Sequence, residues 1–208
     1  MKIILGSKSE GRQKVMKKWG WDFDVMSADI DEKTIRHNDP KKLTLLLANA
    51  KADALLPGIK KPSVLITSDQ VVVYDGKIRE KPETKDQARK FLDSYKDHPA
   101  ETVTSVTVTN TKTRERVEGV DIAKIYFKKI PKEVIERFIK SGVPFHTAGG
   151  FRSEDPIISP YIIRIEGERD SVMGLPKKLT KNLIKKLNII GPTRLSQVRG
   201  KTEHLSEL

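Results

Sequence analysis

The stretch Gly6–Arg12, with the sequence Gly-Ser-Lys-Ser-Glu-Gly-Arg, holds the residue types that bind anions. It follows the apolar run Ile3–Leu5 and opens a segment with helical character. A turn from a buried strand into a helix presents free backbone N–H groups. Here hydroxyls and a guanidinium lie beside them, which suits a phosphate. An ordinary capped turn explains the same residues, because Ser and Gly are common helix caps. The spacing fits neither the P-loop nor the dinucleotide-binding motif.

Asp69 is a second candidate, because Ser68-Asp69-Gln70 places a carboxylate between the apolar runs Val64–Ile66 and Val71–Val73. Burying a carboxylate is costly unless it is paired, hydrogen-bonded or bound to a metal. A second acid group, Asp29-Ile30-Asp31-Glu32, precedes it in the chain. Together they offer the oxygen ligands that Mg²⁺ or Mn²⁺ prefers. The alternatives are a hairpin cap at Asp69 and a solvated acidic loop at 29–32.

Composition narrows the chemistry further. The 208 residues carry 40 Lys and Arg against 28 Asp and Glu, a formal charge of +12, which suits a polyanionic partner such as a nucleotide or nucleic acid. The chain has no cysteine, so disulfides, thiolate catalysis and cysteine metal sites are excluded. His37, His98, His146 and His204 lack the spacing of metal ligands, and we expect them to be structural or solvated. Any metal is therefore expected to be held by oxygen.

The elements that must position these residues alternate between strand and helix. Asp39-Pro40 is typical of a helix start, and helical periodicity continues to Ala54. Asp75-Gly76 predicts a hairpin turn after Val73, and Thr84 with Gln87 forms a capping box for another helix. Further elements are two strands at about 101–109 and 117–127, a helix from Pro131, a strand at 161–165 and a helix from Pro176. The alternation predicts an α/β fold with a mixed sheet.

The ordered set of motifs resembles the Maf family of nucleoside-triphosphate pyrophosphatases. The matching blocks lie in the family's order over residues 2 to about 188 and are Ile4–Arg12, Asp29–Glu32, Leu47–Ala52, Ser68–Val72, Lys81-Pro82, Ala148–Phe151, Ile165–Gly167 and Ser171–Pro176. Two departures stand out. Many relatives have Pro-Arg or Pro-x-Arg where this chain has Glu10-Gly11-Arg12, and commonly have Gly where this chain has Glu80.

The resemblance implies a Maf/ITPase-like fold: an elongated central mixed β-sheet flanked by helices, with two lobes around a nucleotide cleft. It also implies hydrolysis between the α- and β-phosphates of a nucleoside triphosphate, with Mg²⁺ or Mn²⁺, and a homodimer. We expect one such domain over residues 1–190 and a C-terminal tail over 191–208.

The family's roles carry over residue by residue. Ser7, Ser9, Arg12, Lys51 and Lys81 are expected to bind phosphate, although single lysines in so lysine-rich a chain carry no signal alone. Asp69 is expected to be the catalytic acid, with Glu32 supporting it. The same two carboxylates are the expected metal ligands. Whether Asp69 acts as base, metal ligand or both stays open.

Gln70, Phe151 and Glu154 are expected to bind the base. Ser-Asp-Gln at 68–70 and Phe-Arg-Ser-Glu at 151–154 are similar to the 7-methyl-GTP pyrophosphatase branch, whereas the dTTP/UTP branch usually has Ala-Asp-Thr and a Gln in place of Glu154. A carboxylate only accepts hydrogen bonds, which matches the adjacent N1–H and N2–H₂ donors of guanine. The positive charge of a 7-methylated base favours a carboxylate and an aromatic face. The alternative for Glu154 is a solvated residue or a salt bridge to Arg152.

We therefore expect a house-cleaning pyrophosphatase acting on modified or surplus nucleotides, with 7-methyl-GTP as its substrate. The alternatives are a dTTP/UTP pyrophosphatase and a non-enzymatic nucleic-acid-binding or septum and division regulator. The scarcity of aromatic residues that could stack on bases disfavours the nucleic-acid-binding alternative, so nucleic acid is not expected as a partner. The apolar start is short and no run is long enough to span a membrane, which predicts a cytoplasmic protein without membrane contact.

Overall fold

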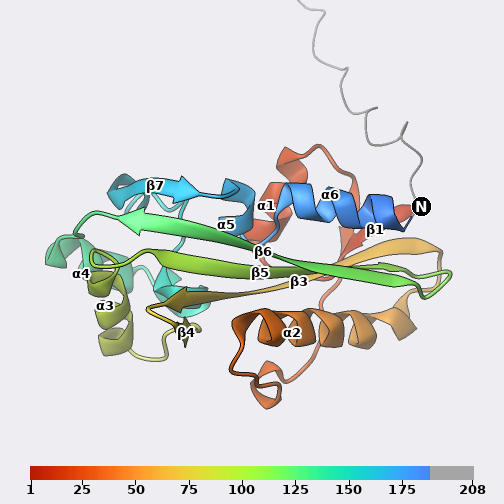
Figure 1. The fold of residues 1–208 in the computed structure, drawn as a ribbon, viewed down its shortest axis with the longest axis horizontal. Helices are drawn as coiled ribbons and strands as arrows, with labels where there is room; N and C mark the ends of the chain where they lie inside the picture. Colours follow the sequence, from red (N-terminus) through yellow and green to blue (C-terminus); the bar gives the residue numbers. More distant parts are fainter. Residues whose placement is uncertain (188–208) are drawn as a thin grey trace, which may run out of the picture.

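The computed structural model describes residues 1–187, arranged as one twisted sheet with helices on both faces (Figure 1). The strands are β1 (Lys2–Leu5), β2 (Phe23–Val25), β3 (Ser63–Tyr74), β4 (Lys77–Arg79), β5 (Ala100–Asn110), β6 (Arg116–Phe127) and β7 (Ile162–Glu166). The α-helices are α1 (Glu10–Lys18), α2 (Pro40–Leu55), α3 (Lys85–Ser94), α4 (Lys132–Lys140), α5 (Arg169–Val172) and α6 (Lys177–Lys186). The expected α/β class with an elongated mixed sheet is confirmed.

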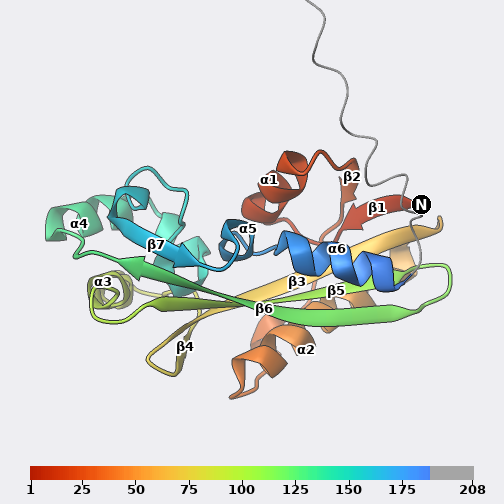
Figure 2. The same cartoon turned by 45° about the horizontal axis from the view of Figure 1, so that its top comes forward.

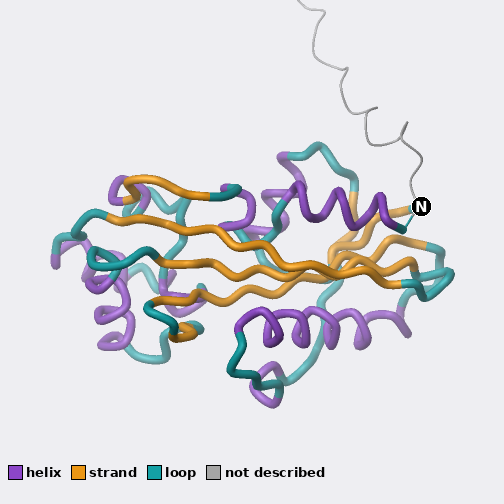
Figure 3. Tube along the Cα trace, viewed as in Figure 1, coloured by secondary structure: helices purple, strands orange, loops and turns teal. Residues whose placement is uncertain are grey.

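The strand order is β2-β1-β3-β5-β6-β7, with β4 paired to β3. β1 runs parallel to both β2 and β3, whereas the other pairs are antiparallel. The long strands β3, β5 and β6 extend along the whole molecule, as the tube in Figure 3 shows. The shorter strands therefore pair with only part of them, which leaves stretches of the long strands open.

One such open stretch lies in the middle of β3. β1 pairs with β3 only as far as Ile66, whose carbonyl accepts from Gly6 N at 2.8 Å. β4 begins to pair at Val72. Between these two points, within the part of the chain that the structure describes, Ser68–Val71 pairs with β5 on one side and with no strand on the other. The backbone thereby leaves a gap in the sheet beside Asp69.

The apolar cores divide the molecule into two lobes joined by the long strands. At the β1 end, α1 and α6 pack on one face of the sheet and α2 on the other (Figures 1 and 2). At the opposite end, α3 and α4 pack with the ends of the long strands around Leu92, Tyr95 and Phe138. The open part of β3 lies between the two cores, so the expected two-lobe architecture is confirmed.

Local sequence signals account for most element boundaries. Asp39 caps α2 through Lys41 N at 2.8 Å, and Thr84 caps α3 through Gln87 N at 3.1 Å. The capping box differs in one respect, because the Gln87 amide oxygen accepts from Glu83 N instead of the N-cap N–H. The two apolar runs around Asp69 form one continuous strand, and the hairpin at Asp75-Gly76 is confirmed by the pairing of Tyr74 with Lys77. The sequence reading did not find β2 or α5, which are three and four residues long.

No helix among residues 1–187 is long and apolar enough to cross a membrane. The expected tail at 191–208, and the boundary at residue 190, lie outside the described residues.

Candidate functional site

A cavity of about 1060 Å³ opens beside the uncovered stretch of β3. All ten residues that the sequence singled out for catalysis, phosphate, base or metal line it: Ser7, Ser9, Arg12, Glu32, Lys51, Asp69, Gln70, Lys81, Phe151 and Glu154. They come from six separate blocks of sequence, and the fold brings all of them to one place. Of the acidic group at 29–32, only Glu32 lines the cavity.

The turn after β1 is held together by its own hydroxyl and guanidinium groups. Ser7 Oγ accepts from Ser9 N at 3.2 Å and from the Arg12 guanidinium at 3.1 Å. Ser9 is the N-cap of α1, as expected for a strand that turns into a helix. Arg12 Nε also donates to the carbonyl of Gly174 at 2.9 Å. The guanidinium is therefore fixed in place with part of its donor set still facing the cavity.

The centre of the site is an ion triplet of Lys51, Asp69 and Glu32. Lys51 Nζ lies 2.6 Å from Asp69 Oδ1 and 2.8 Å from Glu32 Oε1. Lys51 is on α2, one turn after buried Leu47, and Asp69 lies in the middle of β3 on the face that α2 covers. Glu32 is brought in by a short 3₁₀ turn that Asp31 caps through Lys33 N at 3.0 Å. A loop, a helix and a strand thus each contribute one charge.

Burial and charge set the proton affinities of these groups. Burial raises the pKa of the Asp69 carboxyl above its usual range, although Lys51 and Arg12 act in the opposite direction. Burial also acts to raise the pKa of Glu32, but Lys51, Lys81 and Arg12 outweigh it and hold that pKa below its usual range. Burial lowers the pKa of Arg12, which Asp69 and Glu32 partly offset. The two carboxylates are therefore tuned in opposite directions, as is common in catalytic pairs.

Gln70 lies on the other face of β3 from Asp69, because successive side chains of a strand alternate. Its amide nitrogen donates to Thr104 Oγ1 at 2.6 Å and to the carbonyl of Ser171 at 2.8 Å. It lines the same cavity as Asp69. Because the two side chains leave opposite faces of β3, the cavity meets a charged group at Asp69 and an amide at Gln70.

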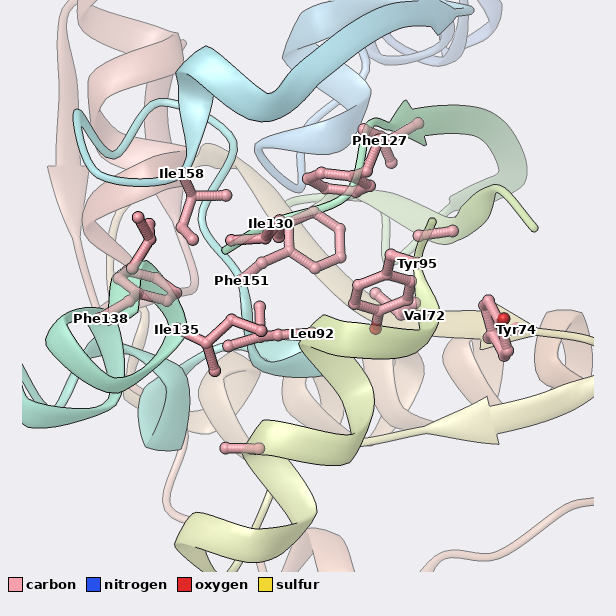
Figure 4. Close-up of a cluster of buried hydrophobic side chains, with 14 of the residues drawn as sticks. Val72, Tyr74, Leu92, Tyr95, Phe127, Ile130, Ile135, Phe138, Phe151 and Ile158 are labelled. Atoms are coloured by element: carbon pink, nitrogen blue, oxygen red, sulfur yellow. The ribbon is translucent and has the colours of Figure 1, made fainter. Parts of the chain in front are cut away.

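Phe151 lies differently from the aromatic face that the sequence predicts. Its side chain is only 5% exposed and stands edge-on to Tyr95 and Phe127, with ring centres 5.3 and 5.2 Å away (Figure 4). The ring is thus a member of the core of the α3–α4 lobe, although Phe151 also borders the cavity. The prediction that Phe151 offers an aromatic face to the base is therefore wrong, because Tyr95 and Phe127 pack against the ring and bury it.

Glu154 is exposed at the cavity wall and accepts a hydrogen bond from Ser153 Oγ at 3.3 Å. Arg152 does not pair with it, and instead its Nη1 lies 3.6 Å from Glu10 Oε2. Glu10 and Glu80 are two of the positions at which this chain departs from the family pattern, and Glu80 Oε1 lies 3.2 Å from Arg36 Nη1. Both acids thus form ion pairs among the lining residues, and Lys81 also lines the cavity.

The sequence reading missed several residues of the same wall. Phe145 and His146, which are half-buried and exposed respectively, border the cavity and precede the Gly149-Gly150 turn. The carbonyls of Ser171 and Gly174, which hold Gln70 and Arg12, were also missed. Backbone carbonyls leave no signal in a sequence, whereas aromatic residues before a glycine pair offered a weak one.

The described residues contain no cluster of three or more His, Cys, Asp or Glu side chains suited to a metal. Two carboxylates nevertheless converge on one point at Lys51. Mg²⁺ is commonly held by one or two carboxylates together with substrate phosphates and water. The donor set of Asp69 and Glu32 therefore fits a divalent ion that draws its other ligands from a bound polyphosphate.

A serine-containing turn with Arg12 and the buried ion triplet of Lys51, Asp69 and Glu32 thus share one cleft of an α/β fold, a set of groups suited to a polyphosphate ligand. Comparison with known proteins makes the assignment more specific. The model of the family described as Maf-like protein matches residues 2–187, and the chain belongs to this family.

Three similar proteins are nucleotide pyrophosphatases by name, and two of them have the same name. A protein of Dictyostelium discoideum named 7-methyl-GTP pyrophosphatase is 50% identical, over 89% of this chain and 97% of its own length. A protein of that name from Idiomarina loihiensis is 33% identical, over 84% of this chain and 88% of its own. A Vibrio vulnificus protein named dTTP/UTP pyrophosphatase is 32% identical, over 88% and 97% of the two chains.

Proposed function

We propose that this protein is a nucleoside-triphosphate pyrophosphatase that cleaves between the α- and β-phosphates, with 7-methyl-GTP as its substrate. The observation that carries the proposal is the contact of Lys51 with both Asp69 and Glu32, beside the Ser7–Arg12 turn and in one cavity. The names of the relatives in Dictyostelium discoideum and Idiomarina loihiensis support the choice of substrate.

The phosphates bind to the turn and to the cationic side chains. Ser7 and Ser9 offer hydroxyls, and Arg12 offers a guanidinium already fixed by Ser7 and Gly174. Lys51 and Lys81 approach from α2 and from the loop after β4. Charge-assisted hydrogen bonds are the strong ones, and they stabilise the charge that develops on the phosphates during transfer.

Asp69 serves the attacking water, either by accepting its proton or by holding the divalent ion. A carboxylate whose pKa is raised by burial is a better base than an exposed one. Glu32, with its lowered pKa, stays ionised and keeps Lys51 in position. Asp69 and Glu32 would hold Mg²⁺ or Mn²⁺, which supplies positive charge to the phosphates when bound.

The base is read by acceptors on the other side of the cavity. Glu154 is exposed and free of Arg152, so its carboxylate is available to the N1–H and N2–H₂ donors of guanine. It also attracts the positive charge of a 7-methylated base. Gln70 and Phe151 line the same cavity, and Phe151 adds apolar contact with the base.

A second candidate is hydrolysis of dTTP or UTP, which the name of the Vibrio vulnificus relative supports. The homodimer and the cytoplasmic location stay predictions. Sedimentation and cell fractionation test them.

The proposal is tested by pyrophosphate release from 7-methyl-GTP, GTP, dTTP and UTP with Mg²⁺ or Mn²⁺. We expect the highest kcat/KM for 7-methyl-GTP, and we expect Glu154→Gln to reduce that preference by about 5- to 100-fold, the scale of a good contact to a base edge. Glu115→Gln, at an exposed position between β5 and β6, is the matched control and should leave the preference unchanged. A preference for dTTP or UTP, or an unchanged ranking in Glu154→Gln, would contradict the choice of base. No pyrophosphate from any nucleotide would overturn the activity.

A further inference from the structure

The amide of Gln70 is held by two groups, on Thr104 and Ser171, that do not line the cavity. Gln70 on β3 lies directly opposite Thr104 on β5, so their side chains leave the same face of the sheet next to each other. α5 covers this face and brings the Ser171 carbonyl to within 2.8 Å of the same amide nitrogen. Thr104 Oγ1 accepts from that nitrogen at 2.6 Å and itself donates to Ser171 O at 3.3 Å.

These contacts fix which end of the amide faces the cavity. A carbonyl oxygen can only accept a hydrogen bond, so the amide atom beside Ser171 O must be the nitrogen. Because the Thr104 hydroxyl proton points to the same carbonyl, its oxygen is left to accept the second N–H. Both protons of the amide nitrogen are thereby used, and a flipped amide would place two oxygens against each other.

The amide oxygen, Oε1, remains as the group that faces a ligand. Among residues 1–187 it receives no hydrogen bond, and the fully buried side-chain atoms without a partner are Asp121 Oδ2 and Ser171 Oγ. Gln70 Oε1 is thus accessible, on a residue that lines the cavity. An amide usually offers both a donor and an acceptor, but here both N–H groups of Gln70 are already bonded and only its oxygen is available to a ligand.

We infer that Thr104 is a positioning residue for base selection, which holds Gln70 as a fixed acceptor and thereby favours guanine bases over bases with an acceptor at the same edge. The inference rests on the proposed function for the identity of the ligand as a nucleotide. A freely turning amide adapts to adenine or uracil, because it can present either end. The fixed acceptor and the carboxylate of Glu154 together match two adjacent donors.

The test uses α,β-methylene analogues of GTP and UTP, which bind without being cleaved. Calorimetry gives the dissociation constants for the full chain and for Thr104→Val, which keeps the shape of the side chain and removes the hydroxyl. Thr104→Ser keeps the hydroxyl, and Thr104→Ala removes it without a branched side chain should the valine variant not fold. Thr109→Val is the matched control, because Thr109 is a fully buried threonine of the same strand that bonds to Arg116 away from the cavity.

We expect the full chain to bind the GTP analogue more tightly, and we expect Thr104→Val to reduce the ratio of the two affinities about tenfold, as for the loss of one hydrogen bond to a base edge. Thr104→Ser and Thr109→Val should keep the ratio. In kinetics, the change should appear in KM and leave kcat nearly the same, because the phosphates are held by other residues.

Three results would overturn the inference: no preference for the GTP analogue in the full chain, an unchanged ratio in both Thr104→Val and Thr104→Ala, or an equal decrease in Thr109→Val. The absence of binding of either analogue would also overturn it. Should the full chain bind the GTP analogue selectively, with the ratio lowered in Thr104→Val but not in Thr109→Val, and yet cleave no triphosphate, the proposed function fails and the role of Thr104 stands.

Discussion

At the scale of single residues, the site depends on two carboxylates that share one ammonium but titrate differently. Asp69 and Lys51 have only 9% and 11% of their side chains exposed, whereas Glu32 is 47% exposed. Water therefore stabilises the charge of Glu32 more than that of Asp69. The nearby cations then hold the pKa of Glu32 below its usual range, whereas burial keeps that of Asp69 above its own. Burial raises the proton affinity of Asp69, at a cost to the stability of the fold.

This cost gives a prediction for Asp69→Asn. Because the pKa of Asp69 is raised in the folded state, its contribution to stability is present at low pH and is lost as the pH rises through that pKa. At neutral pH the amide should therefore not lower the melting temperature, while kcat falls by at least about 100-fold through loss of the base or metal ligand. Thermal melts and steady-state kinetics measure both effects.

The same shift predicts the pH profile of the native protein: the acid limb of kcat/KM should lie above the usual Asp pKa of about 3.9, because Asp69 must lose its proton to act. An acid limb at or below the ordinary value, or a folded Asp69→Asn protein with native turnover, would remove Asp69 from the mechanism.

At the scale of elements, the short helix α5 and the residues after it hold side chains from the turn after β1 and from β3. The carbonyl of Gly174 accepts from Arg12 Nε and from Ser68 Oγ, each at 2.9 Å. α5 is tied to α1 through Asp170, which accepts from Trp19 Nε1 at 2.8 Å and from Lys18 at 3.0 Å. The turn after β1 and the segment that follows α5 are therefore held as one unit.

Gly174→Ala tests this element. Gly174 has a φ of 91°, and an added Cβ would lie 3.2 Å from Arg12 Nε. We expect KM to rise about 5- to 10-fold as Arg12 is displaced, with a loss of about 1 kcal/mol in the free energy of unfolding from backbone strain.

Gly76→Ala is the control, because Gly76 also has a positive φ, of 71°, but nothing within 4 Å of the added Cβ. It should lower stability and leave KM unchanged. Equal values of KM in the two variants would mean that α5 does not position Arg12.

At the scale of the whole molecule, the net charge of +12 raises the question of whether catalysis needs local or only overall positive charge. The described fold concentrates Arg12, Lys51 and Lys81 at one cavity, whereas most other lysines lie on the surface of the helices. Surface charges are screened by salt over about 8–10 Å at ionic strengths near physiological, so they contribute little to binding in the cleft.

We therefore expect Arg12→Ala, Lys51→Ala and Lys81→Ala each to lower kcat/KM by about 10- to 100-fold, as for lost hydrogen bonds to a charged group. Lys185→Ala removes the same charge from an exposed position of α6 and should change kcat/KM by less than about twofold. The comparison is made at one ionic strength with 7-methyl-GTP. Equal losses in all four variants would show that only the overall charge matters.

The sequence by itself determined most of the elements and their order, and it singled out ten residues that line one cavity. Asp39 before Pro40, Thr84 before Gln87 and the apolar run around Asp69 act within a few residues, so they can be interpreted without the rest of the chain. The ordered motifs also identified the family, because several weak local patterns in a fixed order are jointly specific.

Only the tertiary structure decided how these residues meet. Register and packing join segments far apart in the chain, and no local window contains them. The pairing of β3 with β5 places Thr104 against Gln70, the packing of α2 brings Lys51 to Asp69, and the core of the α3–α4 lobe takes up most of Phe151. The direction of the pKa shifts could not be predicted from the sequence either, because the pKa of Asp69 depends on burial and on charges that other elements supply.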